Sequence, residues 1–274
     1  MQLKIFRHLW GVKRPMEESF PEFQKLGYVG IHTNLPPKKE RALFKSLLKK
    51  YRSEYIGMIF TRGNTVREHL KSFREDLVEI KPFKPEMVVA HSGRDRFEES
   101  KSVEFFREAL NIEKEIGIPI AHETHRGRIL YNPWIASKLL SRFENLKLCC
   151  DFSHWVCVCE RLLEGEEDII KQCAERCIHI HARVGFAEGP QVPDPRAPEY
   201  AWHLKKHENW WKLIWKIQQA KKIKVTSLTP EFGPPRYMHS IPYTDVPLAN
   251  LWDICNWMAE RERQQFKRFL KNNF

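Results

Sequence analysis

Residues 117–125 read GIPIAHETH, an apolar run that ends in carboxylate, hydroxyl and imidazole side chains. Three later runs end in the same way: LKLCCDFSH (146–154), CIHIHAR (177–183) and KVTSLTPEFG (224–233). Carboxylates and imidazoles are costly to bury unless they are paired or bind a metal. Four such clusters at the ends of successive strand-like runs therefore predict one shared functional site.

The same alternation of strand-like and helical patterns covers the whole chain. Four further strand-like runs occupy residues 3–12, 28–34, 54–60 and 86–92. Between the runs, apolar residues recur at helical spacing. The expected helices cover residues 16–26, 38–51, 64–80, 99–116, 133–142, 159–175, 205–221 and 247–270.

Eight strand-then-helix units in 274 residues predict an α/β protein, a single (β/α)8 TIM barrel domain over residues 1–274. The main alternative is an open, doubly wound sheet. That fold often carries a glycine-rich phosphate loop after its first strand, and residues 11–15 (GVKRP) contain only one glycine. One long irregular segment, residues 184–202, follows the seventh strand, and loops of this length are usually functional.

Composition narrows the environment and the partners. The formal charge of +11 favours anionic partners, although the lysine pairs along the expected helices are typical of a solvated surface. No basic stretch is interleaved with aromatics as in nucleic-acid modules. No apolar run reaches the length of a membrane span, and the N-terminus lacks a signal-peptide pattern. The seven cysteines lack a disulfide or zinc-finger spacing, so we expect reduced thiols and a cytoplasmic protein.

Active sites of β/α barrels lie at the carboxyl ends of the strands, where all four clusters fall. Glu123, Asp151, His181 and Glu231 would give three oxygen ligands and one imidazole. That set suits one divalent metal ion, Mn²⁺, Mg²⁺, Co²⁺ or Zn²⁺. The ion would polarise a substrate carbonyl and stabilise an enediolate, while Glu123 and Glu231 take and return the proton.

The order Glu123, Asp151-x-x-His154, His181 and Pro230-Glu231 on strands five to eight resembles the xylose isomerase-like barrels, the sugar phosphate isomerase/epimerase superfamily. The resemblance implies that Glu123, Asp151, His181 and Glu231 bind the metal and that the two glutamates act as acid and base. It also implies that His154 and an arginine after His181 hold substrate oxygens. In the epimerases that arginine stands six residues after the histidine, whereas Arg183 stands two after His181.

Several site residues have a second interpretation. Asp151 could be the N-cap of the following helix, and Glu123 could pair with Arg126 or Arg128. His91 and His125 could line the mouth and bind substrate, or could be structural. His8 on the first strand could form part of the pocket wall, and His179 is expected to be a hydrogen-bonded core histidine. Tyr237 lies in a loop and has no firm role.

The leading function is a metal-dependent isomerase or epimerase of a small sugar, sugar phosphate or polyol-derived ketone. Inosose-type dehydration would use the same proton abstraction and is an alternative. A phosphodiesterase of the endonuclease IV type is another, but it requires an Asp-x-His after the seventh strand, where this chain has Asp194-Pro195-Arg196. We therefore do not expect nucleic acid as a partner. The aromatic run Trp210, Trp211 and Trp215 suggests packing between subunits of a homo-oligomer.

Overall fold

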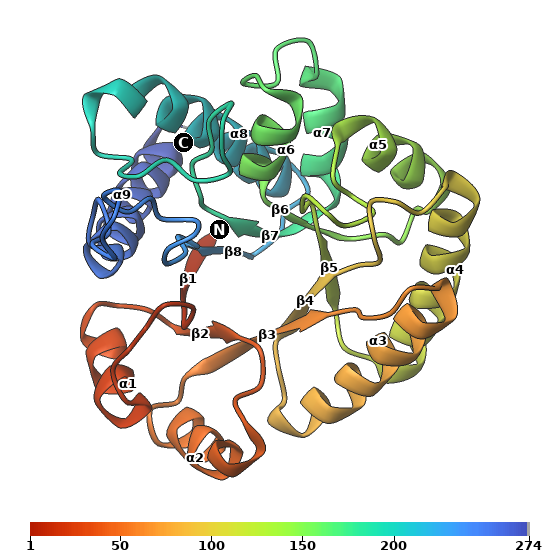
Figure 1. The fold of residues 1–274 in the computed structure, drawn as a ribbon, viewed down its shortest axis with the longest axis horizontal. Helices are drawn as coiled ribbons and strands as arrows, with labels where there is room; N and C mark the ends of the chain where they lie inside the picture. The colour runs from red at the N-terminus through yellow and green to blue at the C-terminus, as the bar shows by residue number, and fades with distance from the viewer. Residues whose placement is uncertain (273–274) are drawn as a thin grey trace.

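The computed structural model describes residues 1–272, in which eight parallel strands close into a barrel inside a ring of helices (Figure 1). Each strand pairs with the next along the chain, and β8 pairs with β1 to close the barrel, with Gln2 opposite Val225. The strands are β1 (Gln2–His8), β2 (Gly30–Thr33), β3 (Glu54–Phe60), β4 (Met87–His91), β5 (Ile120–Glu123), β6 (Leu148–Cys150), β7 (Cys177–His181) and β8 (Val225–Thr229). The expected TIM barrel is confirmed.

The described residues form nine α-helices and three short 3-10 helices. The helices are α1 (Met16–Lys25), α2 (Arg41–Lys50), α3 (Val66–Ile80), α4 (Glu99–Ile116), α5 (Pro133–Arg142), α6 (Phe152–Cys159), α7 (Glu167–Arg176), α8 (Ala201–Ala220) and α9 (Leu251–Lys271), with η1 (Lys38–Glu40), η2 (Lys81–Phe83) and η3 (Pro198–Tyr200). Local sequence explains several ends: Thr65 and Glu68 form a capping box on α3, and Gly117 ends α4 with a positive φ of 75°.

The helix expected over residues 159–175 is wrong in its extent. The chain instead forms α6 directly after β6 and then α7. Asp151 caps the start of α6, and a turn with positive φ at Glu160, Leu163 and Gly165 separates the two helices. The apolar segment FSHWVCV thus turns into a helix as soon as its strand ends, which places residue 154 above the barrel.

Apolar side chains fill two layers. The larger layer lies between the strands and the helices, and a small inner layer consists of Phe6, Ile56, Val89, Ala121 and Cys149. Alternation along each strand sends every second side chain inward, so Cys149 points into the barrel while Cys150 packs outward. The inner apolar layer forms a floor beneath the polar clusters.

The tryptophans of α8 are not exposed. Trp211 and Trp215 are fully buried and Trp210 is nearly so. Trp211, Ile214 and Trp215 share one face of α8, and Trp215 stacks edge-on against Phe266 of α9 at 5.1 Å. The expectation that this run packs between subunits is therefore wrong, because α8 is covered by the chain's own C-terminal helix.

The long segment after β7 is tied to the end of β8. The Gln191 side-chain amide donates to the Gly233 carbonyl at 3.1 Å and accepts from the Gly233 N–H at 2.7 Å, both buried. The His207 ring accepts from the Gly185 N–H at 3.2 Å. These contacts fix the backbone two residues beyond Glu231. None of the helices within residues 1–272 combines the length and apolar character needed to cross a membrane.

Candidate metal and substrate site at the barrel mouth

Four side chains from four consecutive strands meet at the carboxyl end of the barrel. Glu123 and His181 end β5 and β7, Asp151 directly follows β6, and Glu231 lies two residues after β8. Each is at most 4% exposed. One ligand-type atom from each lies within 4.8 Å of the others. The structure thus brings together all four residues that the sequence proposed as metal ligands.

His181 lies at the centre of this group. Its Nδ1 is 3.0 Å from Glu231 Oε2, 3.4 Å from Glu123 Oε1 and 3.9 Å from Asp151 Oδ2. Burial lowers the pKa of His181, but Cys149 and the two glutamates outweigh burial and raise it well above its usual value. When no metal ion lies between His181 and the carboxylates, the protonated His181 ring therefore supplies the positive charge that Glu123 and Glu231 share.

Several atoms of the cluster have no hydrogen-bond partner although they are buried. They are both carboxylate oxygens of Glu123 and both ring nitrogens of His181. The close approaches of His181 to the carboxylates therefore lack hydrogen-bond geometry, and an unmade bond of this kind is costly in a low-dielectric interior. Once His181 loses its proton, its ring lone pair and the carboxylate oxygens converge, and such a set of ligands fits a divalent cation.

Asp151 has two neighbours that compete with a cation. Its Oδ1 accepts from the N–H of Ser153 at 3.1 Å and from the Ser153 hydroxyl at 2.5 Å, so it is the N-cap of α6. Its Oδ2 lies 2.5 Å from Arg183 Nη2. Burial raises the pKa of Asp151 to about 6, despite the opposing effect of Arg183. Asp151 thus serves as a helix cap and an ion-pair partner, and it also faces the candidate metal position.

Arg183 lies inside the site rather than at its rim, because it follows His181 by two residues along the inward face. It is 1% exposed, its Nη1 is 3.4 Å from Glu231 Oε2, and its Nε donates to the Ser153 hydroxyl at 3.1 Å. Its Nη2 is 2.5 Å from His154 Nε2. The guanidinium therefore links the Asp-x-x-His motif to the end of β8.

Both glutamates are held ionised. Burial raises the pKa of Glu231, but His181 and Arg183 outweigh burial and bring the pKa to about 2. Burial likewise opposes ionisation of Glu123, whereas His91 and His181 lower the pKa well below its usual range. Glu123 forms no ion pair with Arg126 or Arg128 within the described chain, so that alternative is wrong.

Histidines surround the two glutamates. His91 Nε2 is 2.7 Å from Glu123 Oε2, and His8 Nε2 is 3.3 Å from Glu231 Oε1. The His125 ring lies between those of His91 and His154, at centroid distances of 4.4 and 3.8 Å. Burial lowers the pKa of His125 to about 3 and that of His154 well below its usual value. The rings of His125 and His154 are therefore neutral and can exchange hydrogen bonds with an uncharged substrate oxygen.

Beneath the site, His179 has both ring nitrogens occupied. Nδ1 lies 2.8 Å from the Ser227 hydroxyl and Nε2 lies 2.9 Å from the Thr229 hydroxyl. His32 also contacts Thr229, at 3.1 Å. His179 is thus a hydrogen-bonded core histidine, as the sequence suggested, and it supports the layer that carries His181.

Sequence reasoning missed Tyr237, Ser153 and Gln191. The Tyr237 ring lies between two guanidinium groups, 5.0 Å from Arg183 and 5.2 Å from Arg126, and 4.9 Å from the ring of Trp10. It comes from a loop without periodicity, so no local pattern marks it. Ser153 lies inside the Asp-x-x-His motif, and a hydroxyl two residues after an N-cap was the available signal.

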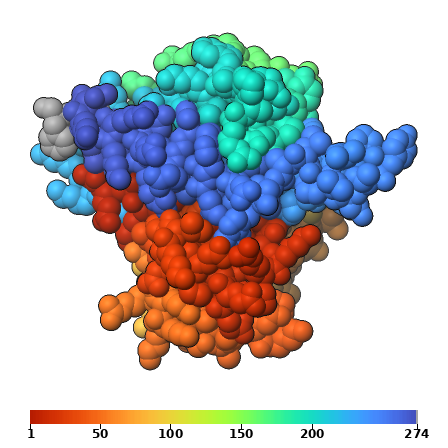
Figure 2. Space-filling model, turned by 90° about the vertical axis from the view of Figure 1, so that its left-hand side faces the viewer, coloured from red at the N-terminus to blue at the C-terminus, as the bar shows by residue number. Residues whose placement is uncertain are grey.

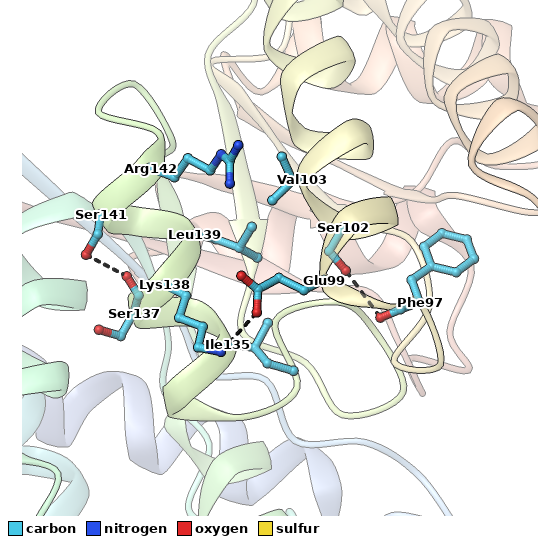
Figure 3. Close-up of a pocket in the computed structure, with 10 residues that line it drawn as sticks. All are labelled: Phe97, Glu99, Ser102, Val103, Ile135, Ser137, Lys138, Leu139, Ser141 and Arg142. Carbon is cyan, nitrogen blue, oxygen red and sulfur yellow. Dashed lines mark hydrogen bonds and ion pairs between the residues drawn. The ribbon is translucent and has the colours of Figure 1, made fainter.

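A separate hollow of about 740 Å3 lies between α4 and α5 on the outer helical layer (Figure 3). Glu99 of α4 and Lys138 of α5 form an ion pair across it, with Nζ 2.9 Å from Oε2. Its lining residues include none of the site residues at the barrel mouth. The chemistry-bearing groups are therefore concentrated at the mouth and not in this groove.

Solved structures share the fold at low sequence identity. A Mycobacterium smegmatis xylose isomerase-like TIM barrel protein in complex with magnesium has a TM-score of 0.64 at 12% identity, over 97% of each chain. The probable 3-DHS dehydratase AsbF of Bacillus anthracis has a TM-score of 0.62 at 13% identity, over 95% of this chain and 98% of that one. The 3-keto-D-glucoside 4-epimerase YcjR of E. coli has a TM-score of 0.59 at 10% identity, over 96% of this chain and 100% of that one.

No protein of curated function matches the chain in sequence. The family model described as xylose isomerase-like TIM barrel matches residues 20–210, which is more than half of the chain. The match spans six of the eight strands of the closed barrel, β2 to β7. The chain therefore belongs to the xylose isomerase-like TIM barrel family.

Proposed function

We propose that this protein is a divalent-metal-dependent isomerase or epimerase acting on a small sugar, sugar phosphate or polyol-derived ketone. The observation that carries the proposal is the meeting of Glu123, Asp151, His181 and Glu231 within 4.8 Å, with the Glu123 and His181 atoms unpartnered. A structural relative was solved in complex with magnesium, which supports divalent-metal binding by a barrel of this fold.

Glu123, His181 and Glu231 would hold the metal, and Asp151 would join them by sharing its Oδ2 with Arg183. When bound, the ion supplies a Lewis acid for neighbouring carbonyl and hydroxyl oxygens of the substrate. Because both glutamates are ionised, either can act as a base toward the carbon next to the carbonyl.

The surrounding side chains position the substrate and the proton. One glutamate removes the proton, and the other returns a proton to the opposite face or to the neighbouring carbon. Arg183 and the neutral ring of His154 bind substrate oxygens, and His91 and His125 line the side next to Glu123. The inward position of Arg183 would place a fixed positive charge near the substrate oxygen that gains negative charge on enolisation, which would lower the barrier to that step.

The test is exchange of substrate hydrogen with solvent. Purified protein with Mn²⁺ is incubated in deuterium oxide with a panel of ketoses, sugar acids and inososes, and label incorporation is followed by mass spectrometry. We expect label at the carbon next to the carbonyl, with loss of incorporation in Glu231→Gln and Glu123→Gln. Glu144→Gln is the matched control, because Glu144 is exposed and forms no ion pair within residues 1–272. Full exchange in Glu231→Gln would refute the acid/base assignment.

Dehydration is an alternative outcome of the same first step. A structural relative is a probable 3-DHS dehydratase, and removal of a proton next to a carbonyl also begins elimination of water. The product distinguishes the two, because elimination gives an enone with a new ultraviolet absorbance whereas epimerisation does not.

Phosphodiester hydrolysis is favoured by one observation. His91 and His125 lie beside the Glu123 carboxylate, and these three residues could hold a second ion. A structural relative from Brucella melitensis is described as an AP endonuclease of family 2, with a TM-score of 0.61 at 14% identity. Metal analysis separates the proposals: we expect one bound ion per chain, and three bound zinc ions would overturn the isomerase proposal.

A further inference from the structure

Arg7 is a buried cation without an anionic partner. It lies on β1 with its side chain on the outer face, opposite to the neighbouring His8, and it is 1% exposed. Among residues 1–272 no carboxylate lies within ion-pair distance of it, and its Nε has no hydrogen-bond acceptor. Its one hydrogen bond runs from Nη1 to the carbonyl of the adjacent His8, at 3.0 Å. Buried charges are normally paired, so this position lacks a counter-charge.

Arg7 lines a hollow of about 850 Å3 formed by two distant segments of the chain. One wall is the β1–α1 loop, residues 11–14, and the other runs from residue 246 into the first turn of α9. Figure 2 shows this side of the molecule, where the red N-terminal segment lies against the blue C-terminal one. None of the residues that line the hollow belongs to the site at the barrel mouth, so the two sites are distinct.

Two more cations from the loop line the hollow. Lys13 is exposed and has no ion-pair partner within the described residues, whereas Arg14 pairs with Glu22. The guanidinium carbons of Arg7 and Arg14 lie 5.4 and 4.8 Å from the same indole ring, that of Trp252. Both guanidinium groups thus contact the same ring, so two cations belong to the wall of the hollow that Trp252 forms.

The first turn of α9 contributes both a positive helix-dipole end and a negative side chain to the lining of the hollow. The positive end of the helix dipole lies at the wall of the hollow. The Asn250 side chain already accepts from the N–H groups of Trp252 and Asp253, so these amides are not free. Asp253 contributes one negative charge to the lining. The recognition therefore rests on the three side-chain cations rather than on free helix amides.

We propose that this hollow binds a phosphate dianion, as free phosphate or as the phosphoryl group of a small metabolite. A dianion neutralises Arg7 and the unpaired Lys13, and guanidinium groups suit phosphate geometry. The proposal is independent of the reaction at the barrel mouth.

The test is isothermal titration calorimetry of EDTA-treated protein with inorganic phosphate, in a non-phosphate buffer at constant ionic strength, and then with glucose 6-phosphate. We expect saturable binding, at least about tenfold weaker in Lys13→Ala and in Arg7→Met, since a charge-assisted hydrogen bond contributes enough for such a change. Lys101→Ala, an exposed lysine on α4, is the matched control. Tighter binding of the sugar phosphate would identify a metabolite, and equal binding would identify free phosphate.

Circular dichroism checks that Arg7→Met remains folded. If that variant unfolds, the test depends on Lys13→Ala, because Lys13 is exposed and its substitution leaves the core intact. Equal affinity in Lys13→Ala and the unaltered protein would overturn the proposal. Loss of phosphate binding in Arg183→Met but not in Lys13→Ala would also overturn it, because the anion would then bind at the barrel mouth. The absence of saturable heat would leave Arg7 as a purely structural cation.

Discussion

Replacing Arg183 by methionine tests whether this residue is the built-in counter-charge of the site. The substitution keeps a long side chain but removes the guanidinium that contacts Asp151 at 2.5 Å and Glu231 at 3.4 Å. The buried carboxylates then retain only His181 as a central positive charge. Breaking a buried ion pair from one side typically costs about 3–5 kcal/mol. For a chain of this size, that corresponds to a fall in Tm of about 6–20 °C.

The assay is thermal unfolding followed by circular dichroism, with EDTA and with excess Mn²⁺. We expect Arg183→Met to be strongly destabilised in EDTA and to regain much more stability from Mn²⁺ than the unaltered protein does. The cation would take over the charge that Arg183 supplied, and binding to the folded state raises stability by mass action. Arg196→Met is the matched control, since Arg196 pairs with Asp194 on the surface and should cost about 1 kcal/mol or less.

Two results would refute this reasoning. If Arg183→Met unfolds at the same temperature as the Arg196→Met control in EDTA, then Arg183 does not balance the buried carboxylates. If Mn²⁺ stabilises neither protein, then the cluster around His181 is not a cation site. A loss of stability that Mn²⁺ does not reverse would show that the packing of Arg183 against Tyr237, at 5.0 Å, matters more than its charge.

Three further changes have expected outcomes. Gln191→Leu leaves the N–H and C=O of Gly233 buried without partners. We therefore expect the free energy of unfolding, measured in urea, to fall by about 1–3 kcal/mol per group, and turnover to fall as well. An unchanged free energy of unfolding would contradict the bridging role of Gln191. Burial, followed by the negative charge of Glu208, raises the pKa of Glu262 in the folded protein well above its usual value of 4.5. The free energy of unfolding is therefore highest below pH 4.5 and falls as the pH rises toward the pKa of Glu262 in the folded state. Glu262→Gln should remove that decline in a Tm profile from pH 4 to 9, and a persisting slope would disprove the assignment. In Gly30→Ala the new Cβ would lie 2.2 Å from a backbone carbonyl oxygen of β3, which should lower stability by about 1–3 kcal/mol in urea unfolding; wild-type stability would show that β3 can shift.

The sequence predicted the barrel and the meeting of the site residues because both depend on local patterns. Each strand is a short apolar run, and Glu123 and His181 fall at the last strand position. Parallel strands in a barrel end at the same face, so the chain order of the clusters was enough to bring them together. The double role of Asp151 was also readable, since an aspartate before a helix is a common N-cap.

The remainder depends on long-range contacts that no local pattern encodes. Tyr237 reaches Arg183 from an aperiodic loop, and Gln191 reaches Gly233 across two connections. The burial of Trp215 could not be predicted either, because an aromatic face on α8 has the same sequence pattern whether α9 or another chain covers it. Contacts between side chains of different loops can therefore be assigned only once the three-dimensional structure of the closed barrel is known.

The internal guanidinium at the barrel mouth also bears on how the protein matures. Arg183 and His181 neutralise the carboxylates from within the chain, so the newly made polypeptide can complete its barrel before it meets any ion. If the mouth binds a metal ion as proposed, loading would follow folding and would depend on the ions available in the surroundings. The protein could then be purified without metal and titrated with one ion after another. Its preference among those ions would be measured on a single folded preparation.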